Sequence, residues 1–157
     1  MRLIFKIIVI TGIIAFVVIQ FFQPEKNIGE ISENHIFKQE QLPEIVQLTI
    51  KNACLDCHSN NTNYPWYNNI APVSWMLNKH VTKGKNELNF SEWGELDAYD
   101  KIGALEDIRQ EVEQKTMPLK AYVAIHKEAK LTDEQRAALI AWIDKKGEEL
   151  VKSSTEK

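Results

Sequence analysis

The chain has 157 residues, of which 44% are hydrophobic and 26% charged, and its formal net charge at pH 7 is −3. This length allows one ordinary domain with a short appendage, and the composition is that of a folded protein. The acidic balance and the lack of a Lys/Arg cluster exclude nucleic-acid binding as a main function, because phosphates are bound by a cationic surface.

An almost unbroken apolar run occupies residues 3–22, with Lys6 as its single cation. About 20 such residues cross a bilayer as a helix, so residues 1–23 are predicted to be a membrane anchor. A cleavable signal is the alternative, but such a signal ends on small residues and this run ends in Phe-Phe-Gln-Pro-Glu. Arg2 and Lys6 near its start predict a cytoplasmic N-terminus, with the rest of the chain periplasmic or extracytoplasmic.

Beyond the anchor the chain divides into three expected parts. Residues 24–42 are polar, with scattered apolar positions, and are predicted to be a tether. A helical domain is expected over 43–150, followed by a polar tail over 151–157. With Arg2 and Lys6 set aside, 17 basic residues face 22 acidic ones, a formal net charge of −5 for the exported part.

The first half of the domain predicts two helices separated by a long loop. Pro43 suits a first helical position, and a helix from there runs into a cysteine pair. Residues 59–73 are rich in turn formers and predict a loop. Residues 74–83 predict a short helix that Gly84 closes, since glycine is the preferred C-terminal cap.

The second half predicts two longer helices. Apolar residues recur at three- and four-residue steps over about 100–115, and the helix stops before Met117-Pro118, because the residue ahead of a proline is disfavoured in the α region. Thr132 to Gln135 form a capping box that opens a helix to about Leu150. No alternating β-branched run occurs, so the predicted fold is all-α and cytochrome c-like.

The two cysteines of the chain fall in one motif, Cys54-Leu-Asp-Cys57-His58. This spacing is the attachment pattern of c-type haem. Two thiols reach the vinyl groups at one porphyrin edge and form thioethers, and the histidine that follows binds the iron. We therefore predict one covalent haem c per chain, attached at Cys54 and Cys57, with His58 as an iron ligand.

Three other uses of a Cys-x-x-Cys pair suit the sequence less well. A thioredoxin-like redox pair accompanies a strand–helix–strand pattern, which is not seen here. A structural zinc site needs four ligands, so distant His80 or His126 would have to complete the pair. A disulfide across two residues closes a very small loop and gains little stability.

The second axial ligand stays open among four side chains, of which Met117 is the first candidate. It follows His58 by 59 residues and is placed before a proline between two predicted helices. As an iron ligand paired with His58, Met117 would raise the reduction potential of the haem. The alternative role for a methionine at this position is to fill a gap in the hydrophobic core. His80 and His126 are further candidates, and His35 is discounted because it lies in the predicted tether.

Aromatic side chains follow the motif closely. A haem needs a large apolar lining, so these side chains are lining candidates, with ordinary core packing as an equal alternative. They are Tyr64, Trp66, Tyr67 and Trp75.

The ordered set of motifs resembles two related groups of proteins. The helix leading into Cys-x-x-Cys-His, the Met117-Pro118 pair and the C-terminal helix resemble class I cytochrome c. Over about residues 35–148 the chain is similar to the bacterial haem-binding domain family of exported cytochrome c-like proteins, in segments 54–62, 64–67, 70–75, 88–93 and 117–142. The resemblance implies thioethers at Cys54 and Cys57, His58 as proximal ligand and Met117 as distal ligand.

These features predict single-electron transfer by a membrane-anchored monohaem cytochrome, not catalysis. Iron held by a Met/His pair has no open position for a substrate, and redox partner proteins would dock weakly near the haem edge. Two alternatives stay open. One is a haem-based sensor or haem enzyme with an open distal site, and the other is a haem-carrying subunit of a larger membrane complex.

Overall fold

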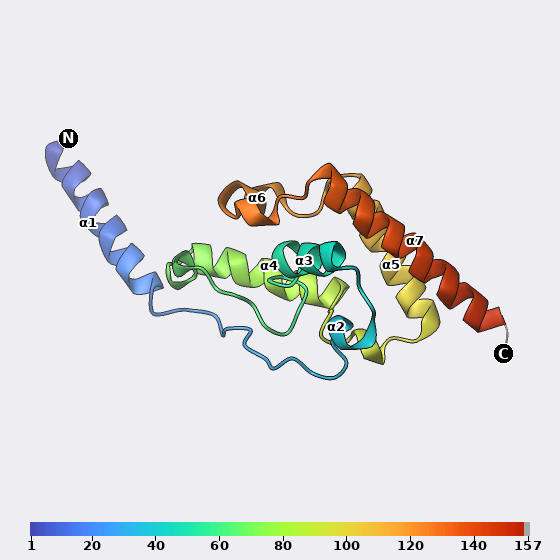
Figure 1. The fold of residues 1–157 in the computed structure, drawn as a ribbon. Coiled ribbons are helices and arrows are strands. Elements are labelled where there is room, and N and C mark those ends of the chain that lie inside the picture. The colour runs from blue at the N-terminus through green and yellow to red at the C-terminus, as the bar shows by residue number, and fades with distance from the viewer. Residues whose placement is uncertain (156–157) are drawn as a thin grey trace.

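The computed structural model describes residues 1–155, and its regular structure is helical (Figure 1). Extended segments in this range meet only at one isolated bridge, between Ile28 and Asn61. The all-α prediction is confirmed. The α-helices are α1 (Arg2–Ile19), α2 (Ile36–Gln39), α3 (Glu44–Ala53), α4 (Val73–Glu87), α5 (Ala98–Glu113), α6 (Lys120–Ile125) and α7 (Asp133–Thr155), and the 3-10 turns are η1 (Trp66–Asn69), η2 (Trp93–Glu95) and η3 (Lys127–Ala129).

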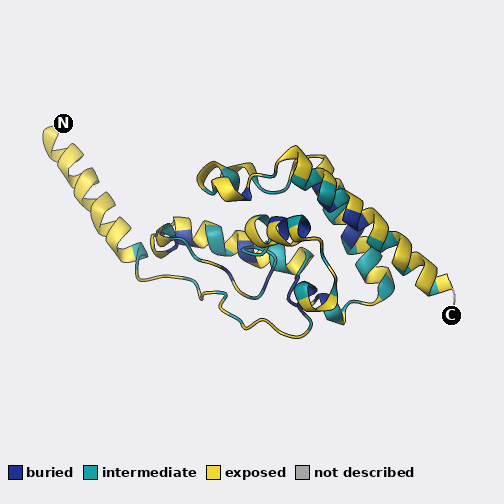
Figure 2. Cartoon of the chain, in the orientation of Figure 1, coloured by how far each residue is buried: buried dark blue, intermediate teal, exposed yellow. Residues whose placement is uncertain are grey.

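Helix α1 projects away from the rest of the molecule (Figures 1 and 2). Its 18 residues have a mean hydropathy of 2.5 and none is buried. At 1.5 Å per residue the helix is about 27 Å long, close to the thickness of a hydrocarbon core. The predicted apolar N-terminal helix is therefore present, and it is long and apolar enough to cross a membrane.

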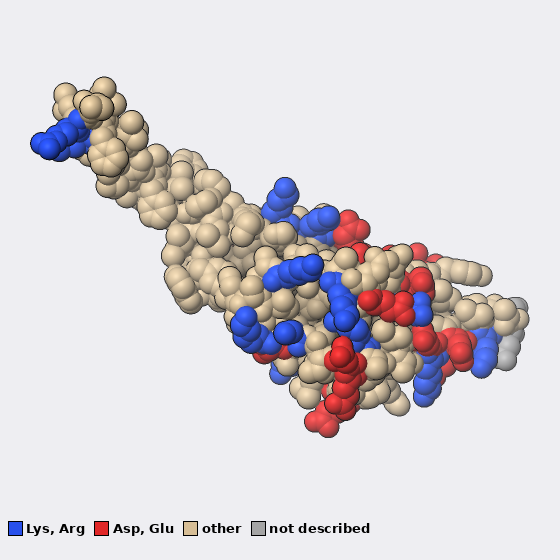
Figure 3. Space-filling view, turned by 90° about the horizontal axis from the view of Figure 1, so that it is seen from above, with Lys and Arg blue, Asp and Glu red and all other residues tan. Residues whose placement is uncertain are grey.

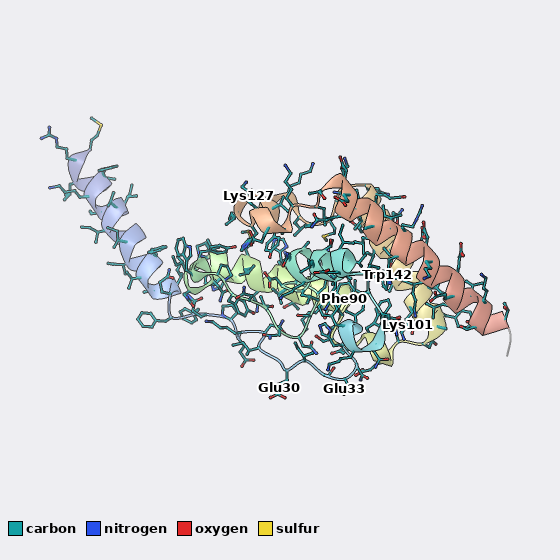
Figure 4. All side chains as sticks on the ribbon, viewed as in Figure 1. Glu30, Glu33, Phe90, Lys101, Lys127 and Trp142 are labelled. Atoms are coloured by element: carbon teal, nitrogen blue, oxygen red, sulfur yellow. The ribbon has the colours of Figure 1, made fainter. Side chains whose placement is uncertain are left out.

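The body packs around one hydrophobic core. Figure 2 shows buried residues on the sides of α3, α5 and α7 that face one another, and Figure 4 places Phe90 beside α3 and Trp142 between α3 and α7. The core residues come from four helices and the segment before α5. They are Ile36, Val46, Ile50, Phe90, Trp93, Leu105, Val112, Leu139, Trp142 and Ile143.

Helices α5 and α7 lie side by side, and α7 begins where the sequence predicts. The Gln135 N–H donates to the Thr132 hydroxyl at 3.1 Å, and the Thr132 N–H donates to the Gln135 side chain at 2.9 Å. This reciprocal capping box satisfies backbone donors that the first helical turn leaves free. Arg109 of α5 bridges to Asp144 of α7 at 3.1 Å.

The segment between α1 and α3 differs from the tether expected over 24–42. Ile36 is fully buried in the core, and His35 is 2% exposed and caps α2 by accepting the Phe37 N–H at 3.1 Å. Asn27 is bound to the loop after the cysteine motif, with its side-chain amide donating to the Ser59 carbonyl at 2.8 Å. Four-residue α2 is too short to show periodicity, which is why its burial could not be predicted.

Helix α4 also differs from the expectation, because it runs through Gly84 to Glu87 instead of ending there. The glycine serves close packing and not chain termination. A Cβ at this position would lie 2.6 Å from the Cys57 carbonyl oxygen. The absence of a side chain lets α4 pass directly against the cysteine motif.

Candidate functional site

The motif Cys54–His58 forms a tight turn at the end of α3. Cys54 is the C-terminal cap of the helix, and its carbonyl oxygen accepts both the Cys57 N–H at 3.1 Å and the His58 N–H at 2.9 Å. Both cysteines are free and half-buried. The turn therefore places two thiols and an imidazole within one short piece of backbone.

The imidazole of His58 is oriented by the segment before η2. Its Nδ1 lies 3.1 Å from the Leu88 carbonyl oxygen, to which it donates as the Nδ1–H tautomer. The His58 carbonyl accepts the Phe90 N–H at 2.8 Å, and the two rings meet edge to face. With Nδ1 engaged, Nε2 is the nitrogen left to bind a metal, the arrangement common among metal-binding histidines.

Burial shapes the protonation of all three groups. Desolvation lowers the pKa of His58, against the opposing effect of its backbone hydrogen bonds, and so favours the neutral ring that can bind iron. Burial raises the pKa of Cys54 to about 12 and that of Cys57 to about 11. Thiols held in this way are poor thiolate nucleophiles, which disfavours a thioredoxin-like pair.

A structural zinc site is not supported either. Across residues 1–155, no three His, Cys, Asp or Glu side chains gather into a group able to hold a metal ion. His80, one of the ligands such a site would need, is exposed on α4. The donor set at the motif, two adjacent thiols and one oriented imidazole, fits covalent haem better than it fits tetrahedral zinc.

The second residue between the cysteines, Asp56, joins the motif to α6 and to the loop that follows the motif. Its Oδ2 accepts the Tyr122 hydroxyl of α6 at 2.5 Å, and its Oδ1 accepts the Asn63 N–H at 3.1 Å. Burial, followed by the hydrogen bond to Asp56, raises the pKa of Tyr122, so the phenol stays protonated and donates. Sequence patterns did not single out Tyr122, because it is 66 residues away from its partner.

His126 lies in an aromatic group beside this contact. Its ring stacks on Tyr122 with centroids 4.3 Å apart, and its Nε2 lies 2.7 Å from the Tyr67 hydroxyl. Its Nδ1 is 3.1 Å from Glu128 Oε1. Because a carboxylate only accepts, Nδ1 carries a proton, and in the neutral ring Nε2 accepts from Tyr67. Both nitrogens of this distal candidate are therefore engaged within the protein.

Met117 lies in the turn between α5 and α6, half-buried, with its N–H donating to the Glu111 carbonyl at 3.2 Å. Helix α6 begins three residues later, and Tyr122 joins that helix to Asp56. The structure thus brings Cys54, Cys57 and His58 together, and it connects the Met117 turn to them through α6.

The aromatic lining candidates separate into two groups. Tyr64 and Tyr67 are half-buried and hydrogen-bonded, to the Asn27 N–H at 2.7 Å and to His126 respectively. Trp66 is 77% exposed and Trp75 41% exposed, so neither packs as core. Sequence reasoning did not assign Leu88 to the site, and it expected Gly84 only as a helix cap. Leu88 contacts the motif through its backbone carbonyl and Gly84 through its missing side chain, and the sequence gives no signal for either contact.

Comparisons with known proteins show the family to which the chain belongs. The profile of the family described as "Haem-binding domain" matches residues 14–145. The chain therefore belongs to the haem-binding domain family, and it is a haem protein. It is also similar to "Cytochrome c peroxidase Ccp" of Escherichia coli (strain K12), at 24% identity over 135 residues. These cover 84% of this chain and 27% of that protein, so the chain spans about a quarter of the relative's length. No solved structure matches.

Proposed function

We propose that the chain is a membrane-anchored c-type cytochrome that carries one covalent haem and transfers single electrons on the extracytoplasmic side. The observation that carries this proposal is the turn after α3. There two half-buried thiols precede an imidazole whose Nδ1 is held at 3.1 Å by the Leu88 carbonyl. Helix α1 is apolar and none of its residues is buried, which supports the anchor.

Each residue of the site has a distinct role in this proposal. Cys54 and Cys57 would hold the haem through thioethers, formed by addition of each thiol to a vinyl group, and His58 would bind the iron through Nε2. The Leu88 carbonyl orients the imidazole through its hydrogen bond to Nδ1, which would hold Nε2 in a fixed direction for the iron. The bound haem supplies a ferric/ferrous couple. Met117 would be the second iron ligand, and iron held by both side chains would have no position for a substrate.

Covalent attachment is tested by denaturing the full-length protein, produced with c-type haem maturation, and measuring haem that stays with the polypeptide. The wild type should retain one haem per chain, and the double variant Cys54→Ala/Cys57→Ala should retain none. Haem that leaves the denatured wild-type chain would refute the c-type proposal while leaving haem binding intact.

The distal ligand is tested by absorption spectra of ferric and ferrous protein with and without carbon monoxide. Met117→Ala should remove the sulfur-to-iron charge-transfer band and open the ferrous protein to carbon monoxide. Met76→Ala is the matched control, because Met76 is 57% exposed on α4 and should leave both properties unchanged. A wild type that already binds carbon monoxide would overturn the closed electron carrier.

A haem enzyme with an open distal site is the second candidate. The similarity to a protein named a cytochrome c peroxidase favours it. This candidate expects the wild type to bind carbon monoxide and to consume hydrogen peroxide with an electron donor. Steady co-purification with other membrane proteins would instead favour a subunit of a larger complex.

A further inference from the structure

The chain that leaves α1 is fastened to the start of α4. The Gln20 side-chain amide pairs with the backbone of Ala71 in both directions, accepting its N–H at 2.9 Å and donating to its carbonyl at 3.1 Å. The Trp75 indole N–H donates to the Phe22 carbonyl at 2.6 Å. The C-terminal end of α1 and the residues after it therefore lie against Ala71, between η1 and α4, and against the first turn of α4.

The same segment stays bound to the body further along. Asn78 donates to the Glu25 carbonyl at 3.2 Å, and the Lys85 ammonium donates to the Asn27 side chain at 2.8 Å. The Thr62 N–H donates to the Asn27 carbonyl at 3.0 Å. Contacts at residues 20, 22, 25 and 27 leave little freedom for α1 to swing relative to the body.

Exposed apolar side chains gather where α1 meets the body. We call this group the apical patch. It consists of Phe21, Phe22, Trp66, Ile70, Val73, Trp75 and Met76, all of them exposed. In Figure 3 the uncharged surface of α1 continues onto the adjoining end of the body. A contiguous apolar surface of this kind marks an interaction site, and aromatic residues are the type enriched at membrane interfaces.

The segment that carries most of the apical patch has no acidic residue, although Glu25 lies nearby, three residues after Phe22. Residues 57–86 contain no Asp or Glu, although the chain has 22 in all, and they contain Lys79, Lys83 and Lys85. The exposed face of α4 is apolar in its first turn and basic at Lys79 and Lys83. Apolar groups followed by lysines that reach outward are typical of a surface lying in the headgroup layer of an anionic membrane.

We propose that the apical patch is seated in the interfacial layer of the bilayer that α1 spans. The body is then held against the membrane, with η1 and the first turn of α4 among the headgroups. This inference rests on the proposed membrane anchoring and goes beyond it, since an anchor alone leaves the body free. The bilayer is the favoured occupant because the patch is continuous with α1 and because the exposed Lys79 and Lys83 of α4 are complementary to anionic lipid.

The seating fixes the height of the haem site. Gly84, which packs on Cys57, follows Val73 by 11 residues of α4, a distance of about 16 Å along the helix axis. The haem-attachment turn would lie at one set distance from the seated end. Redox partners anchored in the same membrane would then find the haem-attachment turn at a constant distance from the bilayer surface.

The test uses the full-length haem-loaded protein in vesicles of phosphatidylcholine and phosphatidylglycerol, prepared with ordinary or brominated acyl chains. Bromine quenches tryptophans that lie in the bilayer, so emission from Trp66 and Trp75 should fall, whereas Trp93 and Trp142 are buried in the body. Trp66→Phe/Trp75→Phe should abolish the bromine-dependent loss. Equal loss in this variant, or no loss in the wild type, would overturn the proposal.

Charge reversal gives an independent measurement on an intact patch. Lys79→Glu/Lys83→Glu should reduce the bromine-dependent loss in vesicles containing phosphatidylglycerol. Lys145→Glu/Lys152→Glu is the matched control, because both lysines are exposed on α7, which lies on the side of the body away from α1 (Figure 1). The seating is refuted if the two pairs behave alike.

Alkaline carbonate extraction separates the two proposals. Retention of the wild type and of all variants in the vesicles supports the anchor, whatever the quenching shows. If the wild type is retained but bromine does not quench its tryptophan emission, the seating of the apical patch is refuted and the anchor is not. Release of the wild type refutes the anchor, and the seating falls with it.

Discussion

Gly84 offers the sharpest test of how α4 packs on the haem motif, because a second glycine provides a matched control. Gly84 and Gly103 both lie within helices, α4 and α5. A Cβ at Gly103 meets nothing within 4 Å, whereas one at Gly84 lies 2.6 Å from the Cys57 carbonyl oxygen and 3.2 Å from its carbonyl carbon. Alanine substitutions at the two sites differ mainly in this clash.

The expected sizes follow from two opposing effects. Alanine within a helix is more stable than glycine by roughly 0.5–1 kcal/mol, so Gly103→Ala should raise the free energy of unfolding by about that amount. At Gly84 the same gain is opposed by overpacking against backbone, which costs about 1–3 kcal/mol. The atom to be displaced is a backbone oxygen of the cysteine turn, so relief by a side-chain rotation is not available.

Gly84→Ala should therefore be less stable than Gly103→Ala by about 1–3 kcal/mol, a difference in Tm of roughly 2–12 °C for a chain of this size. The measurement is unfolding of the haem-loaded full-length proteins in detergent, together with the amount of covalent haem per chain. The displaced turn should also lower haem attachment in Gly84→Ala alone. Two variants of equal stability and haem content would refute the close approach of α4 to Cys57.

Three further predictions concern the body. Tyr122→Phe removes the hydroxyl bound to Asp56 and should lower the free energy of unfolding by about 1–2 kcal/mol, measured by denaturant titration. Thr132→Ala removes the cap that binds Gln135 and should cost about 1 kcal/mol, seen as a lower Tm. Burial lowers the pKa of His35 below its usual value of 6.5. The unfolded chain therefore binds this proton more tightly than the folded protein does. As the pH falls below about 6.5, the free energy of unfolding should decrease, by at most about 1.4 kcal/mol per pH unit. His35→Asn keeps a cap acceptor and should reduce this loss when Tm is compared at pH 7.5 and 5.5.

Each of these predictions has its own contrary result. An unchanged stability of Tyr122→Phe would mean that the contact with Asp56 contributes nothing in solution. A Thr132→Ala variant as stable as the wild type would place the start of α7 under tertiary control. A His35→Asn variant that loses as much stability on acidification as the wild type would assign the pH dependence to other groups.

The local features of this protein were determined by the sequence alone. Three of these features depend only on the spacing and type of neighbouring residues. They are the apolar run of α1, the capping box of α7 and the Cys54–His58 motif. The same is true of the all-α fold, since helical periodicity is visible within one segment. The haem-binding character followed from the motif and agrees with the family to which the chain belongs.

The tertiary structure decided the contacts between distant segments. Leu88 as the partner of His58, Tyr122 as the partner of Asp56 and the fastening of residues 20–27 to α4 join residues that are 30 to 66 positions apart or that act through backbone atoms. Gly84 is the clearest case. Its residue type suggested a helix end, but the helix continued because packing against Cys57 required the missing side chain. Such pairings depend on how the helices assemble, which no local pattern records.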